Sequence, residues 1–598
     1  MYCVGLIRVS GLSYLITIVR RQQVATILGF PVYVVTEVAV TPCSSQSEAE
    51  DAIQKTSQSL RSKGTHALTE DTESEDEDDT ASVGGQADDV NEALEKDEAG
   101  STHSTNNSSF AEDVMRRRGS YGRFAQSWFS KNGWTLEQRK QLGMSGSPTA
   151  SPQLSAISLP AQTENLPVEA DLDSSQYSSS LLPKLLRTLQ ILFGTSRSFY
   201  FSYDLDLTRS LSKAQQGYED DSPLHSRVDP TFFWNRHVLG SFLAAGQDSL
   251  ALPLMQGFIG QHSFSVDKNP NARDASQNDS LEMQDYSVLH GSEPVTSPIL
   301  SAAEVENQQT PQPTHRLTLI SRRSTKRAGL RYLRRGIDED GNVANMVETE
   351  QILSPHEWTK SSPAHSFVQI RGSIPVYFTQ SPYSFKPAPV LQHTNETNYQ
   401  ACKLHLERLV KSYDTVQIVN LVEKRGVEET VGKRFQHAVE RFTEENTESK
   451  TVAFEWFDFH HACRGMKFEN VSELLSTLRE TLKEMGSTKV DQGQIQRKQL
   501  GVIRTNCMDC LDRTNVCQSS FGRHLFEAQL EEEGIDLSTQ SDRELMWFNG
   551  LWADNGDAIS KQYASTAAMK GDFTRTKKRD YRGALNDLGL SLARFYSG

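Results

Sequence analysis

The stretch from residue 500 to residue 534 constrains the fold more than any other. A short apolar run at 500–503 predicts a β-strand, and the loop RTNCMDCLDRTN follows at 504–515. A helix is then predicted from about Thr514 to Glu533, closed by Gly534. A strand, a tight loop and a helix N-terminus aim backbone amides and the positive end of the helix dipole at one point. We therefore expect this loop to bind an anion.

Within the loop, Cys507 stands six positions before Arg513, which is the spacing of a nucleophile and a phosphate clamp. The same spacing occurs twice more, starting at Cys402 and at Cys517. Both of these cysteines lie in predicted helices, where residues six positions apart are separated by about 9 Å along the axis. No phosphate fits between such a pair, so only the loop pair predicts catalysis.

The residue types assign the roles. The field of the loop and helix should lower the pKa of the Cys507 thiol below its free value of roughly 8.5, which makes Cys507 the predicted nucleophile. Arg513 is the predicted clamp because its planar fork pairs with two phosphate oxygens at once. Thr514 is expected to begin and cap the helix while hydrogen-bonding the sulfur. The other predicted loop residues are Met508, Cys510, Leu511 and Asp512.

A hydroxyl leaving group also needs a proton, and so a general acid. Asp509, two residues from the nucleophile, is the first candidate, and Asp512 is the next. Asp554 and Asp557 are alternatives if their segment folds over the site. Two carboxylates in an anion-binding loop raise each other's pKa and oppose thiolate formation. Either one keeps its proton as the acid, or one turns away to pair with a cation.

The pair Cys507 and Cys510 allows two further interpretations. A zinc site would need more ligands, for which His460, His461 and Cys463 are candidates, but their spacing matches no regular zinc site. A disulfide between the two loop cysteines could protect an oxidised nucleophile, although simple packing of Cys510 is the plainer interpretation. We expect no metal and no cofactor.

The whole pattern at 504–515 resembles the signature loop of the Sac family of phosphoinositide phosphatases. Other blocks agree with this resemblance, at 194–206, 232–235, 322–350, 454–460, 552–557 and 573–576. The amino-acid sequences of these blocks most resemble the Sac1 branch. The resemblance covers 1–45 and 181–598, apart from a less similar stretch near 263–315. It implies metal-free hydrolysis of phosphatidylinositol monophosphates, chiefly the 4-phosphate, through a phosphocysteine intermediate.

Strands followed by strand–helix alternation predict an α/β fold, α+β overall. The resemblance implies a β-rich N-terminal Sac subdomain (1–45 and 181–262) and an α/β catalytic domain (316–598). Residues 46–180 are expected to be a disordered acidic and Ser-rich insert, and 263–315 a polar linker or loop at the domain boundary. The net charge of −15 belongs to the insert, because 46–113 hold 19 Asp and Glu against four Lys and Arg.

One basic run is a candidate for contact with a lipid headgroup. Its members are Arg322, Arg323, Lys326, Arg327, Arg331, Arg334 and Arg335. A solvated face is the plain alternative. Nucleic acid is not an expected partner, because the chain outside the acidic insert is neutral and carries no nucleic-acid motif. A polyanionic headgroup in an anionic membrane explains the run better.

Two rival functions remain, a protein tyrosine or dual-specificity phosphatase and a non-catalytic phosphoinositide-binding scaffold. No stretch reaches the ~18 apolar residues of a membrane span, and seven cysteines without a regular framework suit a reducing cytosol. The chain as given is thus expected to be soluble and cytoplasmic. If a membrane anchor follows Gly598, it is expected on the cytosolic face of the endoplasmic reticulum or Golgi. No protein partner is predicted.

Overall fold

The computed structural model describes most of the chain outside one long stretch. The described residues are 2–9, 11–67, 174–214, 222–265, 314–331, 333–381, 388–446, 451–537, 545–569, 571–576, 587, 589–591 and 594. Two ends of the expected disordered insert are helical instead, as α1 (Gln46–Ala67) and α5 (Ser174–Ser196). Its remainder, 68–173, lies outside the described residues.

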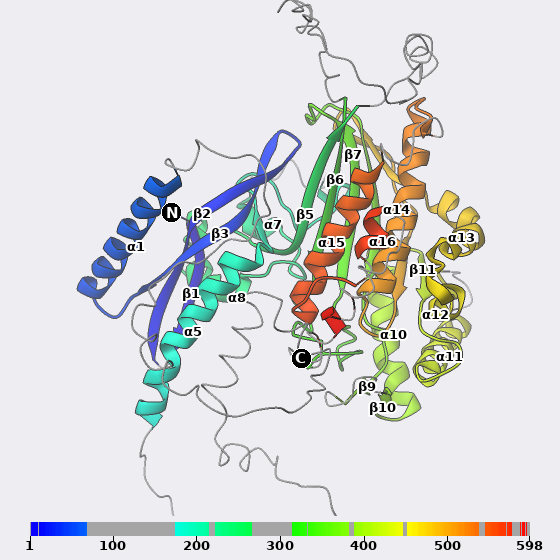
Figure 1. Cartoon of the computed structure of the whole chain (residues 1–598), viewed down its shortest axis with the longest axis horizontal. Coiled ribbons are helices and arrows are strands. Elements are labelled where there is room, and N and C mark those ends of the chain that lie inside the picture. Colours follow the sequence, from blue (N-terminus) through cyan, green and yellow to red (C-terminus); the bar gives the residue numbers. More distant parts are fainter. Residues whose placement is uncertain are drawn as a thin grey trace, which may run out of the picture. The chain divides into compact units, whose positions relative to one another are not determined.

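Among the described residues, one sheet of 13 strands forms the scaffold (Figure 1). Its main path follows β1 (Tyr2–Val9), β2 (Leu12–Ile27), β3 (Phe30–Pro42), β4 (Phe199–Phe201), β5 (Met255–Phe264), β6 (His315–Arg323), β7 (Val347–Pro355), β8 (Ala364–Arg371), β15 (Val502–Asn506), β11 (Val416–Asn420) and β12 (Val452–Trp456). Off this path, β13 (Thr488–Asp491) pairs with β8 and with β14 (Gln494–Arg497). A separate pair is β9 (Phe378–Thr379) with β10 (Val390–Leu391).

The two halves of the sheet differ in strand direction. Along the path from β1 to β8 each strand runs antiparallel to the next, whereas β8, β15, β11 and β12 run parallel to one another. Parallel strands need crossover helices that cover both faces, and the sequence supplies them here. This parallel half bears out the α/β prediction, and the antiparallel half makes the whole chain mixed.

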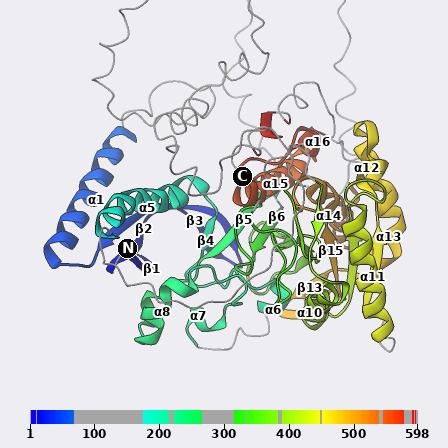
Figure 2. The ribbon, with the colours of Figure 1, turned by 90° about the horizontal axis from the view of Figure 1, so that it is seen from below.

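Helices cover both faces of the parallel strands (Figures 1 and 2). On one face α10 (Asn395–Tyr413) and α11 (Glu429–Glu445) pack in the core that contains Val502. On the other face α13 (Val471–Met485) and α14 (Asp512–Glu532) pack in the core that contains Ile503. Successive side chains of a strand point to opposite faces, so these two neighbours on β15 serve two separate cores.

Shorter and peripheral elements complete the described fold. They are α6 (Leu211–Ala214), α7 (Leu224–Arg227), α8 (Arg236–Ala244), η2 (Asp248–Leu250), α12 (Phe459–Ala462), η4 (Arg464–Met466), η5 (Phe468–Asn470), α15 (Met546–Ala564) and α16 (Gly571–Thr576). Helix α15 lies along β5 and β6, and α5 along β3. No helix in the described part of the chain combines the length and apolar character that crossing a bilayer requires.

The expected boundary at 263–315 does not interrupt the sheet. Strands β5 and β6 flank it and pair antiparallel from Gly257 with Arg322 to Phe264 with His315. The residues before and after it belong to one compact unit, 1–65 with 173–598. The polar stretch, of which 266–313 lie outside the described residues, therefore connects two neighbouring strands of one sheet rather than two separate cores.

Candidate active site

The phosphate loop lies where the sequence predicted it, between the C-terminal end of β15 at Asn506 and the start of α14 at Asp512. The helix begins two residues earlier than expected, so Thr514 lies inside its first turn and does not cap it. The N-terminus of α14 thus directs its dipole at the loop.

The segment that follows β8, together with Asn345, holds the loop backbone through three hydrogen bonds. The Ile374 N–H donates to the Cys507 carbonyl (3.2 Å), and the Ser373 hydroxyl donates to the Met508 carbonyl (2.8 Å). The Asn345 side-chain amide adds a bond to the Asp509 carbonyl (3.1 Å). These bonds fix the loop backbone, and sequence analysis identified none of the three donors.

The Cys507 sulfur lies inside this frame. Its Sγ accepts the Cys510 backbone N–H at 2.9 Å and the Thr514 hydroxyl at 3.6 Å. Burial alone would raise the pKa of the thiol, but hydrogen bonding from Cys510, the Arg513 charge and the Thr514 hydroxyl outweigh it and lower the pKa to about 6. The sulfur is therefore a thiolate at neutral pH.

The second loop cysteine has the opposite character. The Cys510 Sγ–H donates to the Gly372 carbonyl at 2.6 Å, and burial raises the pKa of this thiol well above its ordinary value. A neutral thiol inside the fold matches the packing interpretation of Cys510. Met508 and Leu511 are also buried, so their side chains pack in the interior while their backbone shapes the loop.

Arg513 is held by a partner that the sequence did not reveal. Its Nη1 and Nη2 donate to the two carboxylate oxygens of Glu428 at 2.7 and 2.8 Å, and Nη1 also lies 3.3 Å from the Leu421 carbonyl. Glu428 precedes the first residue of α11, 85 positions away from Arg513. Burial would raise the pKa of Glu428, but the Arg513 charge lowers it, so the pair is ionised.

Asp509, the first candidate for the acid, is ionised in this structure. Its carboxylate lies 3.0 Å from Arg335 Nη2 and 3.7 Å from Arg331 Nε. Burial would raise its pKa, but Arg335, Arg331 and two more distant arginines together lower it. A general acid must carry a proton before the leaving group departs. The structure therefore argues against Asp509 in that role.

The alternatives to Asp509 fall into two groups. Asp512 accepts bonds from Arg594 (2.9 Å) and from the Met569 N–H (2.5 Å), so it has turned away to a cation as one alternative foresaw. Asp554 and Asp557 both contact Arg575, at 2.8 and 3.0 Å. Burial raises the pKa of Asp557, although Ala568 and Arg575 oppose the shift. The pKa shifts of Asp509 and Asp557 thus go in opposite directions, downward for Asp509 and upward for Asp557.

The first part of the basic run is structural. Arg322 is 1% exposed, and its Nη1 and Nη2 pair with Glu348 at 3.1 Å and with Glu350 at 2.6 Å. Arg323 is also buried and donates to the Gln562 carbonyl at 3.0 Å. The prediction that these two arginines contact a lipid headgroup is wrong, because both are enclosed within β6 and its neighbours.

The second part of the run contacts the phosphate loop. Arg335 is buried and, together with half-buried Arg331, holds Asp509. Half-buried Arg327 donates to the Arg335 carbonyl at 2.5 Å and so supports this arrangement. The run is therefore not a free basic surface at these positions.

The exposed members form a turn next to the loop. Lys326 and Arg334 are exposed, and so are Leu330 and Leu333, the latter at 73%. Tyr563 of α15 fixes this turn, because its hydroxyl donates to the Arg334 carbonyl (2.6 Å) and its carbonyl accepts the Arg331 N–H (2.9 Å). We call the described residues 324–331, 333 and 334 the surface turn.

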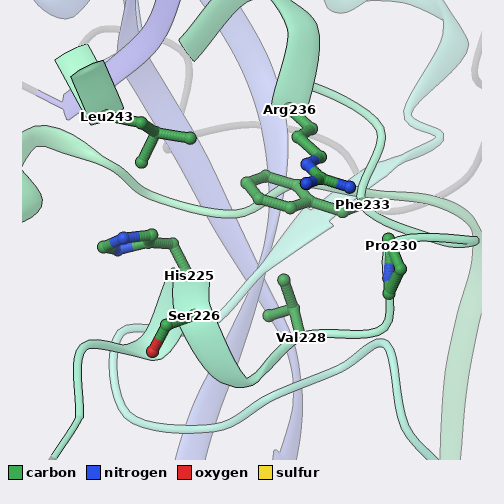
Figure 3. Close-up of a pocket in the computed structure, with 7 residues that line it drawn as sticks. All are labelled: His225, Ser226, Val228, Pro230, Phe233, Arg236 and Leu243. Atoms are coloured by element: carbon green, nitrogen blue, oxygen red, sulfur yellow. The ribbon is translucent and has the colours of Figure 1, made fainter. Parts of the chain in front are cut away.

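Two other features do not contribute to this site. A pocket of about 360 Å³ is lined by His225, Ser226, Val228, Pro230, Phe233, Arg236 and Leu243 (Figure 3). These residues come from α7, α8 and the segment between them, and none belongs to the phosphate loop. Within the described ranges, no three His, Cys, Asp or Glu side chains gather as a metal site requires.

Comparisons with known proteins point to one family. Residues 1–464 match the family model of the SacI homology domain. The chain is 36% identical over 438 residues to the phosphatidylinositide phosphatase SAC2 of Mus musculus, covering 72% of this chain and 36% of that protein. It is 34% identical over 421 residues to the phosphatidylinositol-3-phosphatase SAC1 of Drosophila melanogaster, covering 69% of this chain and 62% of that protein.

A plant relative shows the same extent of similarity. The phosphoinositide phosphatase SAC6 of Arabidopsis thaliana is 34% identical over 405 residues, covering 66% of this chain and 59% of that protein. The match thus spans about a third of the SAC2 relative and about three fifths of the other two.

Proposed function

Because the chain belongs to the SacI homology domain family, we propose that it is a phosphoinositide phosphatase with Cys507 as its nucleophile. The observation that carries the proposal is the buried Cys507 sulfur, which accepts an amide hydrogen bond at 2.9 Å and has a pKa of about 6. Neither a scaffold nor a structural cysteine needs an ionised sulfur at a helix N-terminus.

The proposed reaction has two steps. The Cys507 thiolate attacks phosphorus, the bond from phosphorus to the inositol oxygen breaks, and that oxygen takes a proton from a general acid. Water then gives a proton to the deprotonated acid and attacks the phosphocysteine, the bond from phosphorus to sulfur breaks, and inorganic phosphate and the thiolate are released. Arg513, oriented by Glu428, and the loop amides balance the charge on the phosphoryl oxygens in both steps. No metal takes part in this scheme.

Asp557 replaces Asp509 as our proposed acid. Burial shifts its pKa upward, which is the direction that a proton donor requires. Its neighbour Ala568 is followed by Met569, whose N–H contacts Asp512 next to Arg513. This chain of contacts ties Asp557 to the start of α14.

The proposed substrate is a phosphatidylinositol monophosphate at the cytosolic surface of endoplasmic reticulum or Golgi membranes, chiefly the 4-phosphate. The relatives differ in their printed names, since the Drosophila protein is named a 3-phosphatase and the mouse protein a phosphatidylinositide phosphatase. The surface turn supports a membrane-bound substrate, because exposed cations and exposed leucines together suit the interface of an anionic bilayer.

The test is phosphate release from vesicles that contain the 3-, 4- or 5-phosphate, in the presence of EDTA. We expect the fastest release from the 4-phosphate, no effect of EDTA, and no detectable release by Cys507→Ser. Mass spectrometry of rapidly quenched reactions should find phosphorus on Cys507. Faster hydrolysis of phosphopeptides than of any lipid, or loss of activity in EDTA, would refute the proposal.

A further inference from the structure

A fully buried arginine at the end of β8 lacks the partners that such a residue normally has. Arg371 is 0% exposed, and within the described part of the chain none of its three guanidinium nitrogens has a hydrogen-bond partner. Arg322 and Arg504 are equally buried, yet each is bound by several acceptors. A buried charge without compensation is very costly, so Arg371 needs a counter-charge.

Arg371 lies at the end of β8, next to the strand that leads into the phosphate loop. It pairs in register with Thr505 of the parallel strand β15, two residues before Cys507. Gln369 shares its face of β8 and donates to the Gln518 carbonyl of α14, so this face looks toward the helix that begins at the loop. The next residue, Gly372, accepts the Cys510 thiol hydrogen bond.

Three acidic groups interact electrostatically with Arg371, and only one of them can be its negative counter-charge. They are Cys510, Cys507 and Asp512. Cys510 is a neutral thiol because its pKa is raised well above the ordinary value. Asp512 is already paired with Arg594. The remaining anion is the Cys507 thiolate.

We infer that Arg371 is a positioning residue for the nucleophile. It is a second cation beside Arg513, and it acts from the end of β8 to keep Cys507 ionised. The inference rests on the proposed role of Cys507. Arg513 and Arg371 then hold the thiolate from two sides, one from α14 and one from β8. After attack, the same two cations face the phosphoryl group on sulfur.

Other groups near Cys507 determine how much its pKa would change if Arg371 were removed. The hydrogen bond from Cys510, the Arg513 charge and the Thr514 hydroxyl favour the thiolate, whereas burial and Asp509 oppose it. Asp509 is itself balanced by Arg331 of the surface turn and by Arg335, which follows the turn. Removal of Arg371 therefore leaves part of the stabilisation, and we expect a smaller shift than removal of Arg513 would give.

The test is the pH dependence of Cys507 alkylation by iodoacetamide, followed peptide by peptide by mass spectrometry because the chain has seven cysteines. In Arg371→Met and Arg371→Gln we expect the apparent pKa of Cys507 to rise by about one unit. Arg371→Lys keeps the charge and should stay near wild type. An unchanged Cys507 pKa in a folded neutral variant overturns the inference.

Two features make the test decisive. Alkylation does not require turnover, so a chain without phosphatase activity still reports on Arg371, and failure of the proposed function is seen separately. If neither neutral variant folds, each is combined with Cys507→Ser, which removes the anion that Arg371 balances. Recovery of folding in the double variant supports the inference, and continued misfolding contradicts it.

Discussion

At the residue scale, the ionised sulfur links stability to pH. The pKa of Cys507 is about 6 in the folded chain and roughly 8.5 in an unfolded one, so folding favours the deprotonated form. This contribution is complete above pH 8.5 and is lost as the pH falls through 6. It amounts to about 3 kcal/mol at most, since each unit of pKa is worth about 1.4 kcal/mol.

We therefore predict that the difference in unfolding free energy between wild type and Cys507→Ser changes in favour of wild type by up to about 3 kcal/mol between pH 5.5 and pH 8.5. Urea unfolding at a series of pH values measures it. A difference that does not vary with pH would show that the sulfur is not ionised in the folded state. The rate of phosphate release should rise with pH across the same apparent pKa near 6.

Glu428 offers a second prediction at this scale. Glu428→Gln removes the charge that orients the Arg513 fork, so we expect kcat to fall by about 10- to 100-fold, the cost of misplacing a catalytic group by about 1 Å. Glu429→Gln is the matched control, because its carboxylate pairs with Lys433 on the surface instead. Equal kinetics of the two variants would contradict the orienting role of Glu428.

At the element scale, the sequence predicted the order of strand, loop and helix, but it did not predict the distant residues that hydrogen-bond the loop. A local pattern fixes Cys507, Arg513 and the start of α14 within two residues. Ser373 lies 135 residues from the loop carbonyl that it binds, and no local pattern marks such a pairing. The prediction that Arg322 contacts a lipid headgroup rested on charge alone. It was wrong because a basic run does not reveal that part of it belongs to a buried strand.

The support from β8 can be tested through Ser373. Its hydroxyl donates to the Met508 carbonyl at 2.8 Å and accepts the Gly336 N–H at 3.0 Å. Ser373→Ala leaves both groups unpaired in the interior, so we predict a loss of about 1–3 kcal/mol in unfolding free energy and a lower kcat. Chemical denaturation and phosphate release measure the two effects. A variant with full kcat would show that this bond does not shape the loop.

The surface turn yields a prediction about membranes. Leu333→Ser combined with Lys326→Ser should weaken binding to anionic vesicles and slow lipid hydrolysis on them by about 10-fold, because apolar burial and charge attraction each favour binding. Hydrolysis of a short-chain, water-soluble phosphoinositide should not change. Leu500→Ser is a control, since Leu500 is similarly exposed (63%) but precedes β15, at the far end of that strand from the loop. Equal losses on both substrates would place the turn in catalysis rather than in docking.

At the scale of the whole molecule, the sequence predicted the class of fold but did not reveal that one sheet continues across the polar stretch at 263–315. Polarity at 263–315 suggested a boundary, yet the strands on either side of it pair directly. Backbone pairing between β5 and β6 leaves no trace in the composition of the segment that joins them. The family resemblance, by contrast, rests on blocks spread from residue 194 to residue 576, and the match to the SacI homology domain over 1–464 agrees with it.

The last prediction concerns the acidic stretch. Residues 1–65 and 173–598 form a compact unit without 66–172, so a chain in which 68–173 are replaced by a flexible linker of ~20 residues should keep its thermal midpoint. Its kcat on a water-soluble phosphoinositide should also be unchanged.

The deletion should also change membrane binding. It removes most of the excess of 19 acidic over four basic residues at 46–113, so binding to anionic vesicles should strengthen at low salt and converge with wild type at high salt. Vesicle sedimentation at a series of salt concentrations measures this effect. Weaker binding after the deletion would show instead that the segment itself attaches the chain to the membrane.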